Sequence, residues 1–591
     1  MKVIKKIRNN IDYIFLSIKI VRMSDKNLLF LMILFSTLAG CIPFLLMLLS
    51  QNLLNVLQLK KNFSIVVAAI TYYIFFSIVE VLINNISTYV QEKMQMKIAY
   101  NLNYMLMEKC AKLTLENFED SEIYNKITRL ESEVSFKPFQ VLQSIVSIVS
   151  ALFSAIVAVL IIFRWKPQIV PILLLLLFIN VFYYIKIGKE EFNVQYAMSG
   201  EERKAWYYSY LMTHDLAFKE ISIFGLKRFF LPNFLTIKKK LFSKRMQVKK
   251  KKALFTSFFN IIQEMLVATV VYIAARSAYL GEILIGNVTT YIKTVTLLQS
   301  NSTTLLNGIY SLYNSNLYMK LFFEFLDLPE KSSGGLKINK IEKIEFRKVS
   351  FGYKNKIDVL HNINLVIKKG DTIAIVGKNG SGKSSLLKIL CGLYTIEKGT
   401  IYINGIDIKK IDIKSYKNNI SVLFQDFIKY EMRLDENVFM GDLDQKDNKQ
   451  AVISALNKVD EDLFGNIISQ KEGIYTQLGN WFDDGRQLSG GQWQKIALAR
   501  AYFRGRDVYL LDEPSASLDA EAEVKVFDSF TDICKGKIGI FITHKVAAAK
   551  KASKIIVLDQ GKIVGIGKDE ELYKNCPVYK ELKDNERYEY E

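Results

Sequence analysis

The sequence predicts a two-part chain, in which an all-α six-helix transmembrane domain precedes an α/β domain built around a phosphate-binding loop. Three observations support this fold class. Six long apolar runs lie within the first 313 residues, and the glycine-rich loop GKNGSGKS begins at Gly377 after a strand-like run. The net charge of +20 is also unevenly divided, because residues 1–339 carry +17 and residues 340–591 carry only +3.

The composition excludes several classes of protein. Half of the 591 residues are hydrophobic and 12% are aromatic, which is too apolar for a disordered chain. The five cysteines and three histidines are scattered, so neither a disulfide scaffold nor a multi-histidine metal centre is indicated. A large positive charge fits nucleic acid or a membrane surface, and its location in the apolar part favours an anionic lipid leaflet.

The membrane domain is predicted from runs that reach or approach the ~20 apolar residues needed to cross a bilayer. These runs are Leu28–Ser50, Ser64–Asn84, Phe139–Phe163, Ile169–Ile187, Ala253–Leu280 and Val288–Tyr313. The fourth is slightly short, and the sixth is rich in Thr, Ser and Asn. We expect an N-terminal tail at 1–27, the membrane domain at 28–330, a linker at 331–340 and the domain that carries the glycine-rich loop at 341–591.

Basic residues near the span ends predict the orientation. The tail before Leu28 holds seven basic and two acidic residues, and the segment 186–252 holds sixteen basic and six acidic residues. We therefore expect both termini in the cytoplasm and long cytoplasmic extensions of the helices between spans.

The ionisable side chains within the predicted spans include Glu80, Glu264 and Lys293. Such groups are costly in a bilayer, so they indicate either a water-filled substrate path or hydrogen bonds between helices. The sequence leaves both interpretations open.

The phosphate-binding loop follows the strand-like run Thr372–Val376 and precedes a helix-like run, which is the context of a P-loop. The candidate nucleotide-binding residues here are Gly377, Lys378, Asn379, Gly380, Ser381, Gly382, Lys383, Ser384 and Ser385. The glycines let backbone amides surround phosphates, Lys383 reaches the terminal phosphates, and the Ser384 hydroxyl is a ligand for Mg²⁺.

A second apolar run, Val508–Leu511, ends in two carboxylates. A buried strand would deliver Asp512 to the magnesium ion, while Glu513 polarises the attacking water.

Further motifs complete the pattern. They are the LSGGQ sequence Leu488, Ser489, Gly490, Gly491 and Gln492; Gln425 after Phe424; Asp519 after Ser517-Leu518; His544 after a strand-like run; and Tyr353 before the first glycine-rich loop. With these motifs the chain resembles the ATP-binding cassette (ABC) family over essentially its whole length. The resemblance implies a type I exporter fold and ATP hydrolysis coupled to transport.

The resemblance also implies roles for individual residues. Tyr353 would stack on adenine, Gln425 would join Ser384 and Asp512 at Mg²⁺, and His544 would contact the terminal phosphate. Ser489 and its glycines would meet the nucleotide held by another subunit, with Asp519 nearby. One P-loop and one signature per chain imply two copies, and a homodimer would have two complete sites. A heterodimer with a second half-transporter stays open.

Four stretches resemble the nisin-type lantibiotic exporters in particular. They are Leu211–Asp215, Val422–Phe427, Gln477–Phe482 and Gln492–Arg500, and an insertion precedes the signature at Gly479–Gln487. The resemblance implies export of a lanthionine-containing, leader-bearing precursor peptide, a bacteriocin, across the plasma membrane of a Gram-positive bacterium. It also implies the lanthionine dehydratase and cyclase as partners.

The 27 residues before the first span contain neither Cys nor His. We therefore expect no N-terminal peptidase domain, and another protease would remove the leader.

Two alternatives remain. A lipid or multidrug ABC exporter would have the same architecture. A soluble ABC ATPase acting on DNA would need a basic ATPase half and no spans, so we expect no nucleic-acid partner.

Overall fold

The computed structural model describes residues 13, 15–133, 136–330, 334–353, 358–515 and 520–590. The chain divides into two compact units. The first comprises Met1–Lys112 and Ser121–Pro329, and the second comprises Leu113–Asp120 and Glu330–Glu591.

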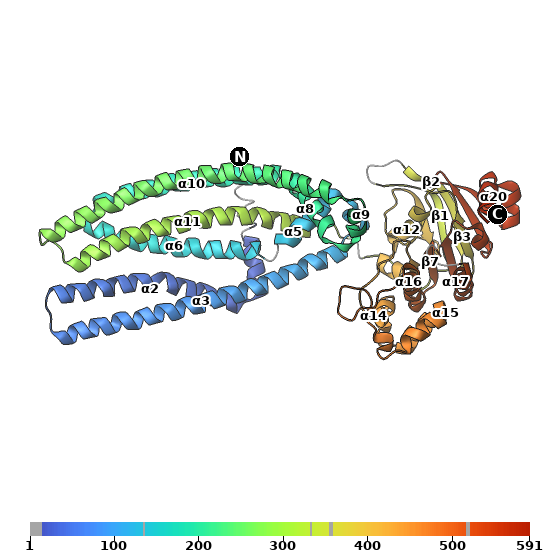
Figure 1. The fold of residues 1–591 in the computed structure, drawn as a ribbon, viewed down its shortest axis with the longest axis horizontal. Helices are drawn as coiled ribbons and strands as arrows, with labels where there is room; N and C mark the ends of the chain where they lie inside the picture. Colours follow the sequence, from blue (N-terminus) through green and yellow to red (C-terminus); the bar gives the residue numbers. More distant parts are fainter. Residues whose placement is uncertain are drawn as a thin grey trace. The chain divides into compact units, whose positions relative to one another are not determined.

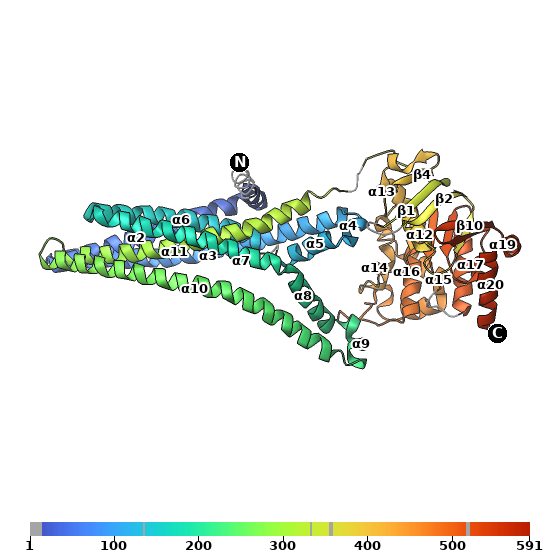
Figure 2. The same ribbon diagram turned by 90° about the horizontal axis from the view of Figure 1, so that it is seen from above.

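The first unit is helical, and its described residues form six long helices, as predicted (Figures 1 and 2). They are α2 (Lys26–Gln58), α3 (Phe63–Lys112), α6 (Lys137–Trp165), α7 (Val170–Ala197), α10 (Lys227–Tyr279) and α11 (Ile285–Leu326). The shorter helices are α5 (Ser121–Glu133), α8 (Ser199–Thr213) and α9 (Phe218–Ile223). The fourth predicted span begins one residue before α7, because Pro167–Ile169 forms a separate 3-10 turn.

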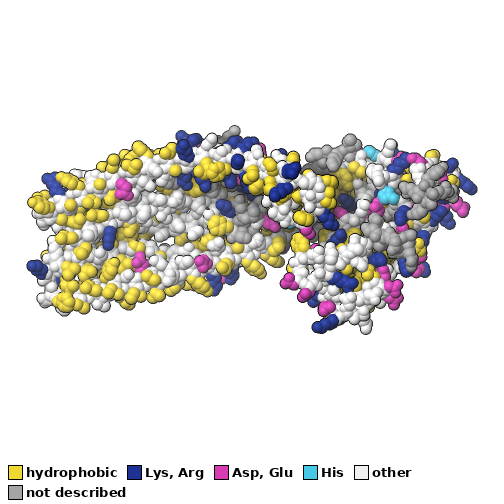
Figure 3. Space-filling view, viewed as in Figure 1, with side chains coloured by type: hydrophobic (Ala, Val, Ile, Leu, Met, Phe, Trp, Pro, Cys, Tyr) yellow, Lys and Arg dark blue, Asp and Glu magenta, His cyan; other side chains and the backbone are white. Residues whose placement is uncertain are grey.

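The surface of this unit is apolar, as expected of helices in lipid. Figure 3 shows hydrophobic side chains spread along the long helices, and exposed examples include Phe30, Phe75 and Phe182. Among the described residues, α2, α3, α6 and α10 are long and apolar enough to cross a membrane. The sixth helix, α11, is less apolar because Thr, Ser and Asn interrupt its run.

A polar cluster joins α2 to α11 near their short connections. Gln51 Nε2 and Asn55 Nδ2 donate to Asn287 Oδ1 at 2.6 and 3.0 Å, and Thr290 Oγ1 donates to Gln51 Oε1 at 3.0 Å. A Cβ atom on Gly286 would collide with the Asn55 side chain and the Gln51 carbonyl. The absence of a side chain at Gly286 therefore lets the two backbones approach and the amides pair.

The described strands of the second unit form two sheets. The strands are β1 (Lys343–Gly352), β2 (Asp358–Lys368), β3 (Thr372–Val376), β4 (Lys398–Ile403), β5 (Ile406–Asp407), β6 (Ile420–Leu423), β7 (Val508–Asp512), β8 (Ile538–Ile542), β9 (Lys554–Asp559) and β10 (Lys562–Gly567). The antiparallel sheet has the order β2-β1-β4-β5, and the larger sheet has the order β10-β9-β3-β8-β7-β6. Strands β3, β7 and β8 are buried at every position, which is typical of parallel strands covered on both faces.

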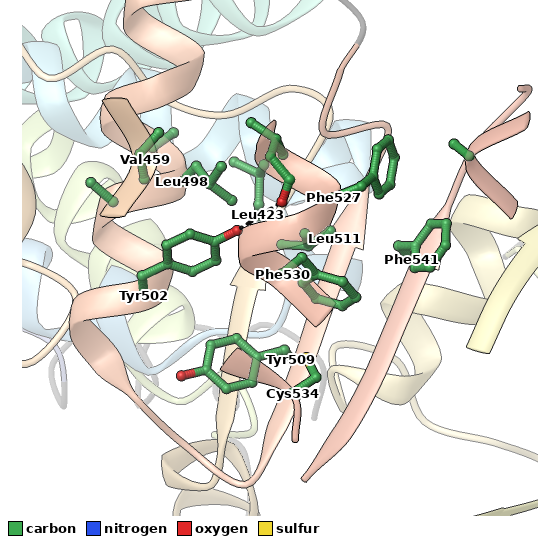
Figure 4. Packing of buried hydrophobic residues seen from close by; sticks show 14 of the residues in the cluster. Leu423, Val459, Leu498, Tyr502, Tyr509, Leu511, Phe527, Phe530, Cys534 and Phe541 are labelled. Atoms are coloured by element: carbon green, nitrogen blue, oxygen red, sulfur yellow. Dashed lines mark hydrogen bonds between the residues drawn. The ribbon is translucent and has the colours of Figure 1, made fainter. Parts of the chain in front are cut away.

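Helices cover these sheets and complete two cores. They are α12 (Lys383–Leu390), α13 (Ile413–Asn418), α14 (Leu434–Phe439), α15 (Lys449–Ile468), α16 (Gly490–Arg504), α17 (Ala520–Ile533), α18 (Val546–Ala549), α19 (Asp569–Asn575) and α20 (Pro577–Tyr590). One core packs α15, α16 and α17 against the larger sheet, with Tyr502, Phe530 and Phe541 among its buried rings (Figure 4). The other lies between the two sheets and α12.

The short helix α4 (Leu115–Glu119) belongs to the second unit, although the sequence predicts it within residues 28–330. The Tyr394 hydroxyl donates to Glu119 Oε1 at 2.6 Å, and the Thr395 amide donates to Glu116 Oε1 at 3.0 Å. Leu115 also packs against the core between the sheets. These contacts explain why α4 groups with the sheets.

Candidate nucleotide site

The candidate catalytic residues follow neighbouring strands of the larger sheet. Strands β3, β8, β7 and β6 are parallel neighbours, so their carboxyl ends meet at one edge. The P-loop follows β3, Gln425 lies two residues after β6, Glu513 follows β7, and His544 lies two residues after β8. The topology thus brings together residues that are up to 167 positions apart in the sequence.

Lys383 lies inside the loop that the sequence identifies as a P-loop. Its Nζ atom donates to the carbonyl oxygens of Gly377 at 2.8 Å and Lys378 at 3.0 Å. Burial lowers the pKa of this ammonium group. Gly382, with φ of 99°, is the N-cap of α12, and a Cβ atom there would collide with Leu360. The loop therefore holds a buried cation at a helix N-terminus, where phosphate oxygens are favoured.

Two buried oxygens at the same edge have no hydrogen-bond partner among the described residues, Ser381 Oγ and Asp512 Oδ1. An unpaired buried polar atom costs about 1–3 kcal/mol. Burial raises the pKa of Asp512 to about 6, although the hydrogen bond from Ser384 acts in the opposite direction and lowers it. These oxygens fit a hard cation and a phosphate as ligands.

Glu513 lies between the two other candidate catalytic side chains. Its Oε1 atom is 2.5 Å from His544 Nε2, and its Oε2 atom accepts a hydrogen bond from Gln425 Nε2 at 2.9 Å. The His544 and Gln425 side chains thus fix the direction of the carboxylate. A carboxylate oriented in this way suits the task of a general base.

The backbone of Glu513 is held in the left-handed region, with φ of 48°. The Glu513 amide donates to the Ile542 carbonyl at 3.1 Å, and Gln494 Nε2 donates to the Glu513 carbonyl at 3.1 Å. Non-glycine residues in this region cluster at functional sites. Buried Gln494 could not be identified from the sequence, because nothing in the local pattern distinguishes it from a packing residue of α16.

Tyr353 lies at the edge of an aromatic cluster. Its ring packs edge-on against Phe351 and Tyr394, with centroids 5.1 and 5.4 Å apart, and its hydroxyl is 2.9 Å from Ser385 Oγ. Because Tyr394 also bonds to Glu119, this cluster joins Tyr353 to helix α4.

The LSGGQ signature begins helix α16. Ser489 is its N-cap, and it forms a reciprocal pair with Gln492, in which each side chain accepts from the other's backbone amide at 3.3 and 2.9 Å. Leu488 is buried, whereas Ser489 and Gly490 are exposed. The motif is therefore rigid at its base and open on its outer side. Asp519 lies outside the described residues.

The insertion before the signature is anchored at its base. Glu431 Oε2 accepts from the Asn480 and Trp481 amides at 2.8 and 2.7 Å. Trp481 and Phe482 are 69% and 60% exposed, so the loop presents two aromatic rings on the surface.

Glu80, Glu264 and Lys293 lie on three different helices. Glu264 on α10 accepts from Gln299 Nε2 at 3.1 Å, and Lys293 on α11 donates to Ser50 Oγ at 3.4 Å. Glu80 on α3 is half-buried. The first two therefore take part in interhelical hydrogen bonds, and all three stay candidates for a substrate path.

Comparisons with known proteins agree with this architecture. Residues 29–302 match the ABC transporter transmembrane region, and residues 360–516 match the ABC transporter family. The chain is 43% identical to the subtilin transport ATP-binding protein SpaT of Bacillus subtilis, over 96% of this chain and 93% of that protein. It is 33% identical to the nisin transport ATP-binding protein NisT of Lactococcus lactis subsp. lactis, over 97% and 96%.

The fold is similar to the structure of a bacterial Atm1-family ABC exporter with ATP bound. That comparison has a TM-score of 0.80 and 19% identity, and it covers 95% of this chain and 98% of the other. The chain therefore belongs to the ABC transporter family, as a multi-pass membrane exporter with the type I fold that couples ATP hydrolysis to transport.

Proposed function

We propose that the chain is a homodimeric exporter of a lanthionine-containing precursor peptide that still carries its leader. The observation that supports this cargo best is the 43% identity to SpaT, which extends over nearly the whole of both chains and not only over the ATPase. SpaT and NisT are named as subtilin and nisin transport proteins.

ATP hydrolysis in this proposal uses the edge where the parallel strands end. Lys383 and the P-loop amides bind the phosphates, Tyr353 stacks on the adenine, and Glu513 accepts a proton from the attacking water. His544 and Gln425 orient the Glu513 carboxylate through their contacts at 2.5 and 2.9 Å.

Mg²⁺ fits the same edge. Asp512, Ser384 and Gln425 would supply oxygen ligands, and Asp512 Oδ1 is buried without a partner among the described residues. When bound, Mg²⁺ neutralises the charge that develops on the phosphate oxygens.

The homodimer is supported by the presence of both a P-loop and a signature motif in one chain, because each is half of a nucleotide site. Ser489 and Gly490 are exposed at the start of α16, and no hydrogen bond joins them to the P-loop within the described ranges. A second copy would place its signature over this P-loop and receive the reverse contact. A twofold dimer closes both sites at once.

We place the protein in the plasma membrane of a Gram-positive bacterium with both termini in the cytoplasm. The excess of basic residues in 186–252 supports this orientation. The lanthionine dehydratase and cyclase are the cytoplasmic partners in the same proposal.

The decisive experiment measures ATP hydrolysis by the purified chain in liposomes. We expect stimulation by the modified precursor peptide with its leader, and weaker stimulation by the unmodified precursor or by the peptide without its leader. Stimulation by lipids or hydrophobic drugs, with none by the precursor, would instead support the lipid or multidrug exporter. Activity that requires a second half-transporter would contradict the homodimer.

Glu80 and Glu264 are candidates for attracting a cationic peptide into the path. We expect the double variant Glu80→Ala, Glu264→Ala to export such a peptide more slowly. Unchanged export would remove both residues from the proposed path.

A further inference from the structure

The C-terminal helix α20 is attached firmly to the ATPase unit through α19. The buried Tyr579 donates its hydroxyl to Asp569 Oδ1 at 2.9 Å, and Lys583 Nζ donates to both oxygens of Asp569 at 2.9 and 3.0 Å. The Tyr573 hydroxyl donates to Asp584 at 3.0 Å. These bonds fix the rotation of α20 about its axis, and therefore the direction in which its other side chains point.

One of those side chains, Glu586, binds the segment directly after His544. Its Oε2 atom accepts from the Val546 amide at 2.8 Å and from the Ala547 amide at 3.3 Å. These residues begin α18, and Lys545 at its N-cap makes no capping side-chain bond. Glu586 therefore supplies from a distant helix the carboxylate that an N-cap residue would normally provide.

A second acidic residue of α20 contacts the P-loop. Glu581 Oε1 is 2.7 Å from Lys378 Nζ, and this contact raises the pKa of Lys378. Both side chains are about half exposed, so the pair alone contributes little to stability. The position of the pair is informative, because it shows that α20 contacts both the segment after β3 and the segment after β8.

We propose that α20 is a positioning element for the catalytic edge, in which Glu586 fixes the imidazole of His544 by holding the first turn of α18. Only one residue separates His544 from Val546, the first of the two residues whose amides Glu586 binds. Loss of those bonds would let the start of α18 move, and the 2.5 Å contact between His544 and Glu513 would then no longer be held in place. Glu581 has a smaller role, in which it holds the Lys378 side chain at the edge of the P-loop.

This inference rests on the proposed roles of Glu513 and His544, but not on the cargo. Basal ATP hydrolysis tests it in the absence of any peptide, so a failure of the peptide-export proposal would leave the result intact. If Glu513 and His544 are not catalytic, their own variants will show it independently of Glu586.

The experiment compares the full-length variants Glu586→Ala and Glu586→Gln with the control Glu570→Ala in liposomes. Glu570 is an exposed carboxylate on the neighbouring helix α19. We expect Glu586→Ala to lower kcat by about 5–30-fold, the factor that follows from losing a cap, while the KM for ATP changes less than about twofold. Glu586→Gln keeps an oxygen that accepts from both amides, so its kcat should stay within about threefold of the wild type.

Hydrogen exchange separates positioning from a general loss of folding. In Glu586→Ala we expect faster exchange at Val546 and Ala547, with unchanged exchange in the buried strands β3 and β7. A kcat for Glu586→Ala equal to that of Glu570→Ala would overturn the proposal. Equal losses of kcat in the Ala and Gln variants, or a rise in KM without a fall in kcat, would do the same.

Discussion

Replacing Glu513 by glutamine changes the chemistry of the site while keeping the size of the side chain. In the structure the carboxylate contacts His544 through one oxygen and Gln425 through the other, at 2.5 and 2.9 Å. The glutamine amide has one acceptor oxygen and one NH₂ group, so only one of the two contacts can persist in its present form. The amide also has no capacity to take a proton from water.

The expected loss follows from that second change. Proton transfer by a positioned side chain contributes about 10²–10⁴-fold to a rate, which corresponds to about 3–5 kcal/mol of activation free energy. We therefore expect kcat for ATP hydrolysis to fall at least about 100-fold in Glu513→Gln. ATP affinity should stay within about threefold, because Lys383 and the P-loop amides are unchanged.

The assay is phosphate release by the purified variant in liposomes, with ATP binding measured in parallel. Glu570→Gln serves as the control, since it removes an exposed carboxylate on α19. A Glu513→Gln rate within about tenfold of the wild-type rate would refute the assignment of the general base. Loss of ATP binding together with turnover would also refute the reasoning, because it would show that the variant disturbs the loop itself.

Three further predictions concern binding and packing. Lys383→Ala should abolish ATP binding, because the loop loses its buried cation, and saturable binding at millimolar ATP would contradict this. Tyr353→Ala should raise the KM for ATP by about 5–150-fold, since stacking on a base contributes about 1–3 kcal/mol, whereas Tyr353→Phe should not. Gly286→Ala should lower the free energy of unfolding by about 1–3 kcal/mol through the collision with Asn55, measured as a lower Tm. The matched control is Gly200→Ala, where no atom lies within 4 Å of the added carbon, and an equal Tm for both variants would count against the prediction.

Much of the fold could be predicted because its signals are local. The strand-like runs before Gly377 and Glu513 are continuous and apolar, and each ends in polar residues whose spacing is dictated by the phosphates they approach. If the two strands belong to one parallel sheet, their carboxyl ends lie at the same edge. The P-loop and Glu513 are therefore expected to lie close together.

The contacts that could not be predicted join residues that are far apart in the sequence and meet only in the folded chain. Glu586 binds amides forty residues earlier in the chain, and Gln494 reaches a carbonyl nineteen residues later. Neither position has a local pattern that distinguishes it from an ordinary helix residue. The assignment of α4 to the second unit likewise depends on hydrogen bonds to Tyr394 and Thr395, almost 280 positions away.

The place of β8 within the larger sheet has a consequence for synthesis of the chain. This strand, Ile538–Ile542, lies between β3 and β7, although it is translated after both of them. A nascent chain that ends before β8 contains the P-loop and both carboxylates, but it has no strand to hold β3 beside β7. Such non-local pairing forms late in folding. The edge that brings the P-loop beside the two carboxylates can therefore form only after β8 has been translated, when the helices of the membrane unit have already been made.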